Sequence, residues 1–287
     1  MSCVVDLARV RHVVLDMDGT LFLGKQLFPA TLPFLERLRR LGIGYTFLTN
    51  NTSRSKAQHV ERLQRLGIEA RENEIYTPAE SAIAYLQRRL PDRRAVAVLG
   101  TPSLCRQFEE AGFVLDWDAP HAVVVGFDTT LTYDRLCKTA YWIGTGLPFV
   151  ATHPDFICPT DQQTILVDCG SICACLTAAT GRKPVVLGKP DPSILLDLAA
   201  RLGLRPGEML MVGDRIYTDM RMARDAGVPG VLVLTGEATA TQAASIPQPP
   251  DLVIADVGEL GVRLEAAGVR TWRNGPMRPI CAHEGDR

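Results

Sequence analysis

The amino-acid sequence predicts an α/β protein with a doubly wound, mostly parallel sheet. Apolar runs too short for helices alternate along the chain with stretches of helical period, and short turns join them. Such alternation builds parallel strands with right-handed crossovers, which place helices on both faces of a sheet. At 287 residues the chain exceeds the usual single domain, so a second domain has room.

The first elements are predicted from short-range patterns. An apolar run at 13–15 reads as a buried strand, and a helix is predicted over 31–41, where leucines recur at helical spacing and Gly42 provides a stop. A second strand at 45–48 precedes a predicted helix over 57–66, which ends at Gly67.

Two carboxylates, Asp16 and Asp18, directly follow the first strand. Ligands bind outside the carboxyl ends of strands in open α/β sheets, so a site is expected here. Alternate residues of an extended chain point opposite ways; the two carboxylates converge only if the chain turns, which Gly19 permits. The pattern predicts a nucleophile beside a proton-transfer group, with a loop whose Asp residues bond their own backbone as the plain alternative.

Polar residues also follow the other predicted strands. Thr49, Asn50 and Asn51 come after the second, and Lys189 stands between a glycine and a proline after the apolar run at 185–187. A helix cap would explain Thr52 or Ser53, and Asn51 with them, but it does not need the whole run of three; a solvated surface group is the usual interpretation of one lysine. Neither alternative explains why each group stands at a strand end.

A strand at 209–212 ends in Gly213 and Asp214, and Asp219 follows five residues later. Thr218 could cap a helix that starts near Asp219, whose charge suits a helix amino terminus. That role explains Asp219 more readily than Asp214, which sits at a strand end as Asp16 does.

In order along the chain, these four segments resemble the motifs of the haloacid dehalogenase-type phosphatases, beginning with DMDGTL at 16–21. The resemblance implies that Asp16 attacks phosphorus and that Asp18 protonates the leaving group and later activates water. It also implies that Thr49 and Asn50, with Asn51 beside them, hold phosphate oxygens. Lys189 would pair with the nucleophile and the phosphate.

The same resemblance implies a Mg²⁺ ion. Asp214, one oxygen of Asp16, the main-chain carbonyl of Asp18, water and a phosphate oxygen would form the hard-oxygen shell that this ion prefers. Asp219 would act in or just behind that shell.

A long insert between the second and third motifs, with the segments at 151–155, 170–172 and 178–181, resembles the NagD-type branch, which carries an inserted α/β cap and acts on small phosphorylated metabolites. It implies a core at 1–78 and 183–269 and a cap at 79–182. The last eighteen residues, 270–287, mix Arg, Pro and Gly with few apolar residues, which predicts a flexible tail. The cap is expected to contain strands at 95–99 and 122–125 and helices at 102–111 and 133–144. The core is expected to resume with strands at 185–187, 209–212, 231–234 and 252–255.

Three cap residues are candidates for substrate contact. His153 stands where the branch usually has Asn, and it reads either as a buried structural histidine or as a donor to a substrate hydroxyl. Asp168 and Cys169 replace a proline- and glycine-rich approach. The charge of Asp168 predicts weaker action on phosphoglycolate, which carries a carboxylate, than on sugar phosphates.

Composition narrows the partners. The net charge of −1 provides no field for nucleic acid or anionic membranes, and no run approaches the roughly 18 apolar residues that span a bilayer. The amino-terminal sequence lacks the pattern of a signal peptide, so a cytoplasmic location is expected. The branch often pairs through its caps, which implies a possible homodimer.

Other functions use the same motifs. A phosphoprotein phosphatase would act on phosphopeptides as readily as on sugar phosphates, although a large cap should obstruct them. A phosphotransferase differs only in the acceptor that competes with water. A non-catalytic phosphate-binding protein is disfavoured, because all four core groups are present: Asp16, Asp18, Lys189 and Asp214.

Overall fold

The computed structural model describes residues 5–159 and 163–268, and the expected tail at 270–287 lies outside them. The chain divides into two compact units, the first formed by Met1–Leu48 and Pro192–Arg287 and the second by Thr49–Asp191. These limits follow the contacts within each unit and lie next to Thr49 and close to Lys189. They do not test the core and cap boundaries expected at 78 and 183, which stay predictions.

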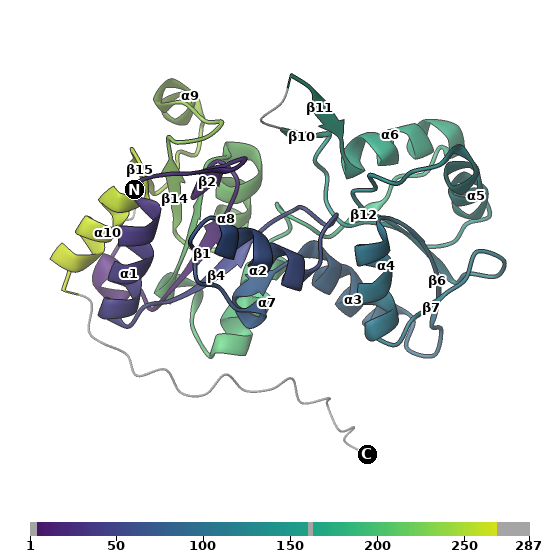
Figure 1. Cartoon of the computed structure of the whole chain (residues 1–287), viewed down its shortest axis with the longest axis horizontal. Helices are drawn as coiled ribbons and strands as arrows, with labels where there is room; N and C mark the ends of the chain where they lie inside the picture. The colour runs from purple at the N-terminus through teal and green to yellow at the C-terminus, as the bar shows by residue number, and fades with distance from the viewer. Residues whose placement is uncertain (1–4, 160–162, 269–287) are drawn as a thin grey trace, which may run out of the picture. The chain divides into compact units, whose positions relative to one another are not determined.

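The first unit contains parallel strands in the order β15-β14-β13-β1-β4. These are β1 (His12–Asp16), β4 (Gly44–Leu48), β13 (Met209–Gly213), β14 (Gly230–Val233) and β15 (Leu252–Ile254). The order runs outward from β1 in both directions, so crossovers of one hand place helices on opposite faces. Figure 1 shows α1 and α10 on one side of this sheet and α7 and α8 on the other.

The helices of the first unit connect these strands or follow them. They are α1 (Thr31–Leu41), α7 (Ser193–Leu202), α8 (Arg221–Ala226), α9 (Ala240–Ser245) and α10 (Val257–Ala266), with short turns η1 (Leu7–Arg9), η3 (Pro206–Glu208) and η4 (Ile216–Met220) and a small hairpin of β2 (Phe22–Leu23) and β3 (Gln26–Leu27). Helix α1 has the predicted bounds. It ends because Gly42 adopts the left-handed conformation at φ 70°.

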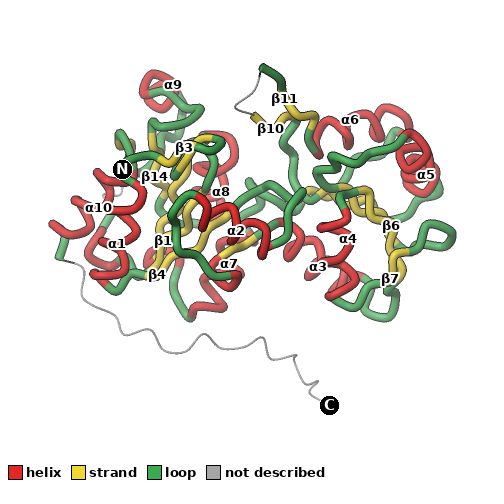
Figure 2. The backbone as a smooth tube through the Cα atoms, viewed as in Figure 1, coloured by secondary structure: helices red, strands yellow, loops and turns green. Residues whose placement is uncertain are grey.

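The second unit contains a five-stranded parallel sheet in the order β12-β9-β8-β6-β7. Its elements are α2 (Lys56–Arg65), η2 (Glu72–Glu74), β5 (Ile75–Tyr76), α3 (Pro78–Arg89), β6 (Ala95–Leu99), α4 (Pro102–Glu110), β7 (Val114–Leu115), β8 (Ala122–Val125), α5 (Tyr133–Gly144), β9 (Phe149–Ala151), α6 (Cys169–Thr180) and β12 (Val185–Val186). An antiparallel hairpin joins β10 (Ile157–Pro159) to β11 (Ile165–Val167). Figure 2 distinguishes the helices, strands and loops.

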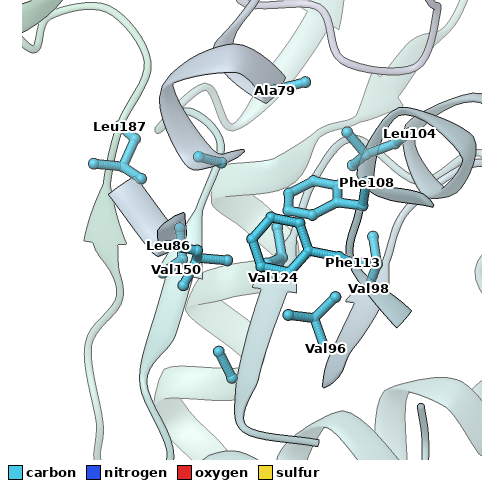
Figure 3. Packing of buried hydrophobic residues seen from close by; sticks show 12 residues of the cluster. Ala79, Leu86, Val96, Val98, Leu104, Phe108, Phe113, Val124, Val150 and Leu187 are labelled. Atoms are coloured by element: carbon cyan, nitrogen blue, oxygen red, sulfur yellow. The ribbon is translucent and has the colours of Figure 1, made fainter. Parts of the chain in front are cut away.

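Both faces of this second sheet are buried. Along β6, Val96 and Val98 contribute to one apolar cluster, while Ala97 and Leu99 contribute to the other. Figure 3 shows the first cluster, where Phe108 and Phe113 lie beside the valines of the sheet. Strands buried on both faces read as continuous apolar runs, which is why β6 and β8 have the bounds that the sequence predicts.

Strand β12 pairs in a different sheet from the one that the sequence predicts. The run at 185–187 was expected to resume the core, but Val185 and Val186 pair with Val150 and Ala151 of β9 in the second unit. A two-residue strand carries too little sequence pattern to specify its neighbouring strand. The sheet that it joins is therefore known only from its hydrogen-bonded partner in the structure.

No helix within residues 5–159 and 163–268 is both long and apolar enough to cross a membrane.

Because two histidines are buried, we expect the free energy of unfolding to fall on acidification. Burial lowers the pKa of His12 and of His59 to about 4, and neither residue is more than 6% exposed. The unfolded chain binds these protons below about pH 6.5. Stability from each histidine is therefore complete above that pH and is lost as the pH falls toward 4.

Chemical denaturation at pH 7 and pH 4.5 should show this loss. We expect each histidine to contribute about 2 to 3 kcal/mol to the difference in unfolding free energy between the two pH values. His59→Gln should therefore show a smaller acid-induced loss than the parent. An equal loss in both proteins would contradict the assignment.

Candidate active site

Three buried carboxylates gather in the first unit at the carboxyl ends of neighbouring strands. Asp16 ends β1, Asp214 follows β13, and Asp219 lies in the turn η4. Strands β1 and β13 are hydrogen-bonded neighbours, so their ends meet at one edge of the sheet. One oxygen from each carboxylate lies within 4.8 Å of the others.

The turn after β1 brings the backbone close to this cluster. Gly19 has φ 88°, and a Cβ there would lie 2.4 Å from Asp214 Oδ2. Any larger residue would strain the turn and collide with the carboxylate. Thr20 Oγ1 donates to Asp16 Oδ2 over 3.1 Å, which orients the carboxylate at the end of the strand.

The electrostatics of the cluster fit a bound cation. Burial and the charges of Asp16 and Asp219 raise the pKa of Asp214 to about 7. Asp214 Oδ2 accepts from the Glu237 amide at 2.8 Å, whereas the buried Oδ1 has no hydrogen-bond partner among the described residues. An all-oxygen set with one buried, unpaired oxygen fits a hard divalent ion such as Mg²⁺.

Two further expectations concern Asp18 and Thr218 in the first unit. Asp18 lies half-buried in the turn after β1, and its side chain is not part of the three-carboxylate cluster. The metal ligand predicted at this residue is its own main-chain carbonyl oxygen, and that role stays a prediction. Thr218 does not cap a helix: it lies inside η4, whose flanking residue is Arg215, and its hydroxyl has no partner among the described residues.

The second unit holds the polar residues that follow β4 together with Lys189. Thr49 Oγ1 accepts from the Asn51 amide at 3.1 Å, and Asn51 Oδ1 accepts from the Ser53 amide at 3.0 Å. The Lys189 amide donates to Asn50 Oδ1 over 2.9 Å. Residues far apart in the sequence, Asn50 and Lys189, are therefore in direct contact.

The predicted cap residues pair with one another. His153 Nε2 lies 2.8 Å from Asp168 Oδ1, and its Nδ1 lies 2.9 Å from Thr152 Oγ1. Asp168 Oδ1 also accepts from the Cys169 amide and so caps α6. Burial opposes a charge on His153, but the negative charges of Cys169 and Asp168 outweigh it and raise its pKa to about 9.

This pairing favours the structural reading of His153. The ring and Asp168 are both nearly fully buried, and both ring nitrogens face partners within the unit. Asp168 Oδ1 is already engaged by His153 and the Cys169 amide, so that carboxylate is a weak basis for repelling acidic substrates. Sequence reasoning missed Asp155, two residues beyond His153, whose carboxylate contacts Asn50. Its only signal was its place in the segment at 151–155.

The fold and the first-unit cluster define an α/β protein with three buried carboxylates, able to hold a cation, at the carboxyl edge of a parallel sheet. Two family models match this chain. Haloacid dehalogenase-like hydrolase matches residues 13–114 and HAD-hydrolase-like matches residues 186–260. The chain belongs to the haloacid dehalogenase-like hydrolases, and within them it is a phosphatase of the NagD type.

Curated relatives support this assignment. A 5'-nucleotidase from Bacillus subtilis is 33% identical over 78% of this chain and 86% of its own length. An acid sugar phosphatase from Staphylococcus aureus is 30% identical over 88% of this chain and 97% of its own length.

Solved structures agree with these relatives. A 4-nitrophenylphosphatase from Thermotoga maritima has a TM-score of 0.85 and 38% identity, covering 90% of this chain and 98% of its own. NagD from Escherichia coli K-12 has a TM-score of 0.80 and 28% identity over 87% and 98%. A Mycobacterium tuberculosis glycerol phosphate phosphatase in complex with magnesium has a TM-score of 0.82 and 33% identity over 88% and 77%.

Proposed function

We propose that the protein is a Mg²⁺-dependent phosphomonoesterase that hydrolyses small phosphorylated metabolites, with sugar phosphates as the first class to test. The gathering of Asp16 with Asp214 and Asp219 in one buried cluster carries the proposal. The names of the sugar phosphatase and glycerol phosphate phosphatase relatives support the substrate class, and the magnesium complex supports the metal.

In the proposed reaction, Asp16 attacks phosphorus in line with the ester bond. A bond forms between its carboxylate oxygen and phosphorus, the ester bond breaks, and Asp18 gives a proton to the leaving alkoxide. Asp18 then removes a proton from water, which attacks the aspartyl phosphate and releases phosphate with Asp16 restored. One carboxyl group serves as acid and afterwards as base.

Charge limits this reaction, because a carboxylate must approach a phosphate that is also negative. Mg²⁺ bound by Asp16, Asp214 and Asp219 would supply charge neutralisation. Lys189 would add a second positive charge, and Thr49 with the backbone beside it would donate to phosphate oxygens.

Phosphate release from a panel of esters tests the proposal. The panel contains sugar phosphates, glycerol phosphate, nucleoside 5'-monophosphates, phosphoglycolate and a phosphopeptide, each with and without Mg²⁺. We expect metal-dependent release that is fastest with sugar phosphates. Faster release from nucleotides would move the substrate class toward that of the 5'-nucleotidase relative.

Three further outcomes would reject the proposal. Comparable release from the phosphopeptide would indicate a phosphoprotein phosphatase. Transfer to an added alcohol in preference to water would indicate a phosphotransferase, and no reaction with any ester would indicate a binding protein. The expected cytoplasmic location and the homodimer through the cap stay predictions.

A further inference from the structure

The side chain of Asn50 joins three segments of the second unit. Its Oδ1 accepts from the amide of Lys189 at 2.9 Å, and its Nδ2 donates to the carbonyl of the same residue at 3.1 Å. Nδ2 also donates to Asp155 Oδ2 over 3.2 Å. Asn50 is 7% exposed and Lys189 4% exposed, so these contacts are largely shielded from water.

The hydrogen-bonding capacity of a carboxamide makes this arrangement specific. An Asn side chain has two N–H donors on one nitrogen and one carbonyl oxygen. Both donors of Asn50 are used within the protein, by Lys189 and Asp155. The side chain therefore has no remaining N–H for a phosphate oxygen, which is the role that the sequence motif suggested for it.

The glycine before Lys189 allows the close approach. A Cβ at Gly188 would lie 2.8 Å from Asn50 Oδ1 and 2.5 Å from the Thr152 carbonyl. The backbone at this point is packed against both the Asn50 side chain and the segment that contains Thr152. Any larger residue would push the Lys189 backbone away from the carboxamide.

Asp155 determines which way the carboxamide points. Turning the amide over would place its oxygen against the Asp155 carboxylate and the Lys189 carbonyl, and its N–H groups against the Lys189 amide. Three favourable contacts would become three repulsive ones. The Asp155 carboxylate therefore favours the orientation in which Asn50 bonds both the amide and the carbonyl of Lys189.

We propose that Asn50 is a positioning residue for Lys189 and that Asp155 orients it, so that the backbone from which the lysine side chain extends is held in one place. This inference rests on the proposed function, in which the Lys189 ammonium must reach the phosphate. A flexible lysine gains most from a fixed starting point, and a misplacement of about 1 Å costs roughly 100-fold in rate.

A double-mutant cycle tests the proposal with Asn50→Asp, Asp155→Asn and the combined variant. Asp at position 50 still accepts from the Lys189 amide, but its second oxygen faces the Lys189 carbonyl and the Asp155 carboxylate. In the combined variant, Asn at position 155 donates to Asp at position 50. The bond to the Lys189 carbonyl is still missing, and one oxygen of Asp at position 50 still faces that carbonyl.

Two readouts are taken on each protein. Hydrogen–deuterium exchange of the peptide covering residues 187–191 measures how firmly Asn50 holds the Lys189 backbone. It needs no substrate, so it remains informative if the phosphatase proposal fails. Steady-state kinetics then separate kcat from KM. Asn73→Asp, the same substitution at an exposed site of the second unit, is the matched control.

We expect Asn50→Asp to speed exchange at 187–191 and to lower kcat/KM about 100-fold, mostly through kcat. Adding Asp155→Asn should recover about tenfold of that loss and slow the exchange again, although the same change brings no gain in the parent. The control should match the parent in both readouts.

Unchanged exchange in Asn50→Asp would overturn the proposal. So would equal activity of the single and combined variants, because a side chain that binds phosphate directly is not rescued from position 155. If Asn50→Asp does not fold, the combined variant decides alone. Parent-like folding and exchange in the combined variant support the positioning role of Asn50. Failure of that variant to fold, or fast exchange in it, rejects the role.

Discussion

Asp16→Asn should lower kcat by about four orders of magnitude or more while the fold persists. The amide is a poor nucleophile, and loss of a covalent nucleophile has cost enzymes up to roughly 10⁶-fold. The substitution nearly preserves shape and keeps an oxygen that can accept from Thr20 Oγ1. It also relieves the repulsion among three buried carboxylates, so the melting temperature in metal-free buffer should hold or rise.

Turnover of 4-nitrophenyl phosphate and a thermal melt measure both parts of this prediction. Asp92→Asn makes the same chemical change at an exposed turn and should match the parent. Activity of Asp16→Asn close to that of the parent would end the covalent scheme. A variant that is inactive and also unfolded would be uninformative about chemistry, so the melt must accompany the rate.

Removal of the divalent ion should have the second largest effect. Exhaustive chelation is expected to lower kcat/KM by roughly 1000-fold or more, because the site then lacks the charge that offsets three carboxylates and a phosphate. Added Mg²⁺ should restore the rate. Full activity after chelation would count decisively against a metal-dependent mechanism.

A thermal shift measures metal binding without substrate. An ion that binds only the folded state at 100 times its Kd stabilises it by about 2.7 kcal/mol. Mg²⁺ should therefore raise the melting temperature of the parent, and Asp214→Asn should show a smaller rise because Oδ1 of Asp214 is the unpaired buried oxygen. Equal shifts in both proteins would place the ion elsewhere, and Asp92→Asn again serves as the control.

The sequence predicted the parts of the fold that depend on local pattern. Helix α5 and strands β6 and β8 have the expected bounds, because helical spacing and continuous apolar runs are short-range signals. The run at 185–186 shows the limit. Its residues are extended as expected, but they pair with β9 of the second unit, since two apolar residues do not specify a partner strand.

The sequence by itself determined which chemical groups stand at the strand ends, because spacing along a strand and the following turn are local properties. It thereby predicted Asp16, Asp214 and Asp219, which the fold brings together in one cluster. Only the tertiary structure decided how polar side chains are used. Asn50 finds its partners 105 and 139 residues away, and His153 pairs with Asp168 fifteen residues on. Hydrogen bonds over such separations depend on how the whole unit packs, and no local pattern encodes them.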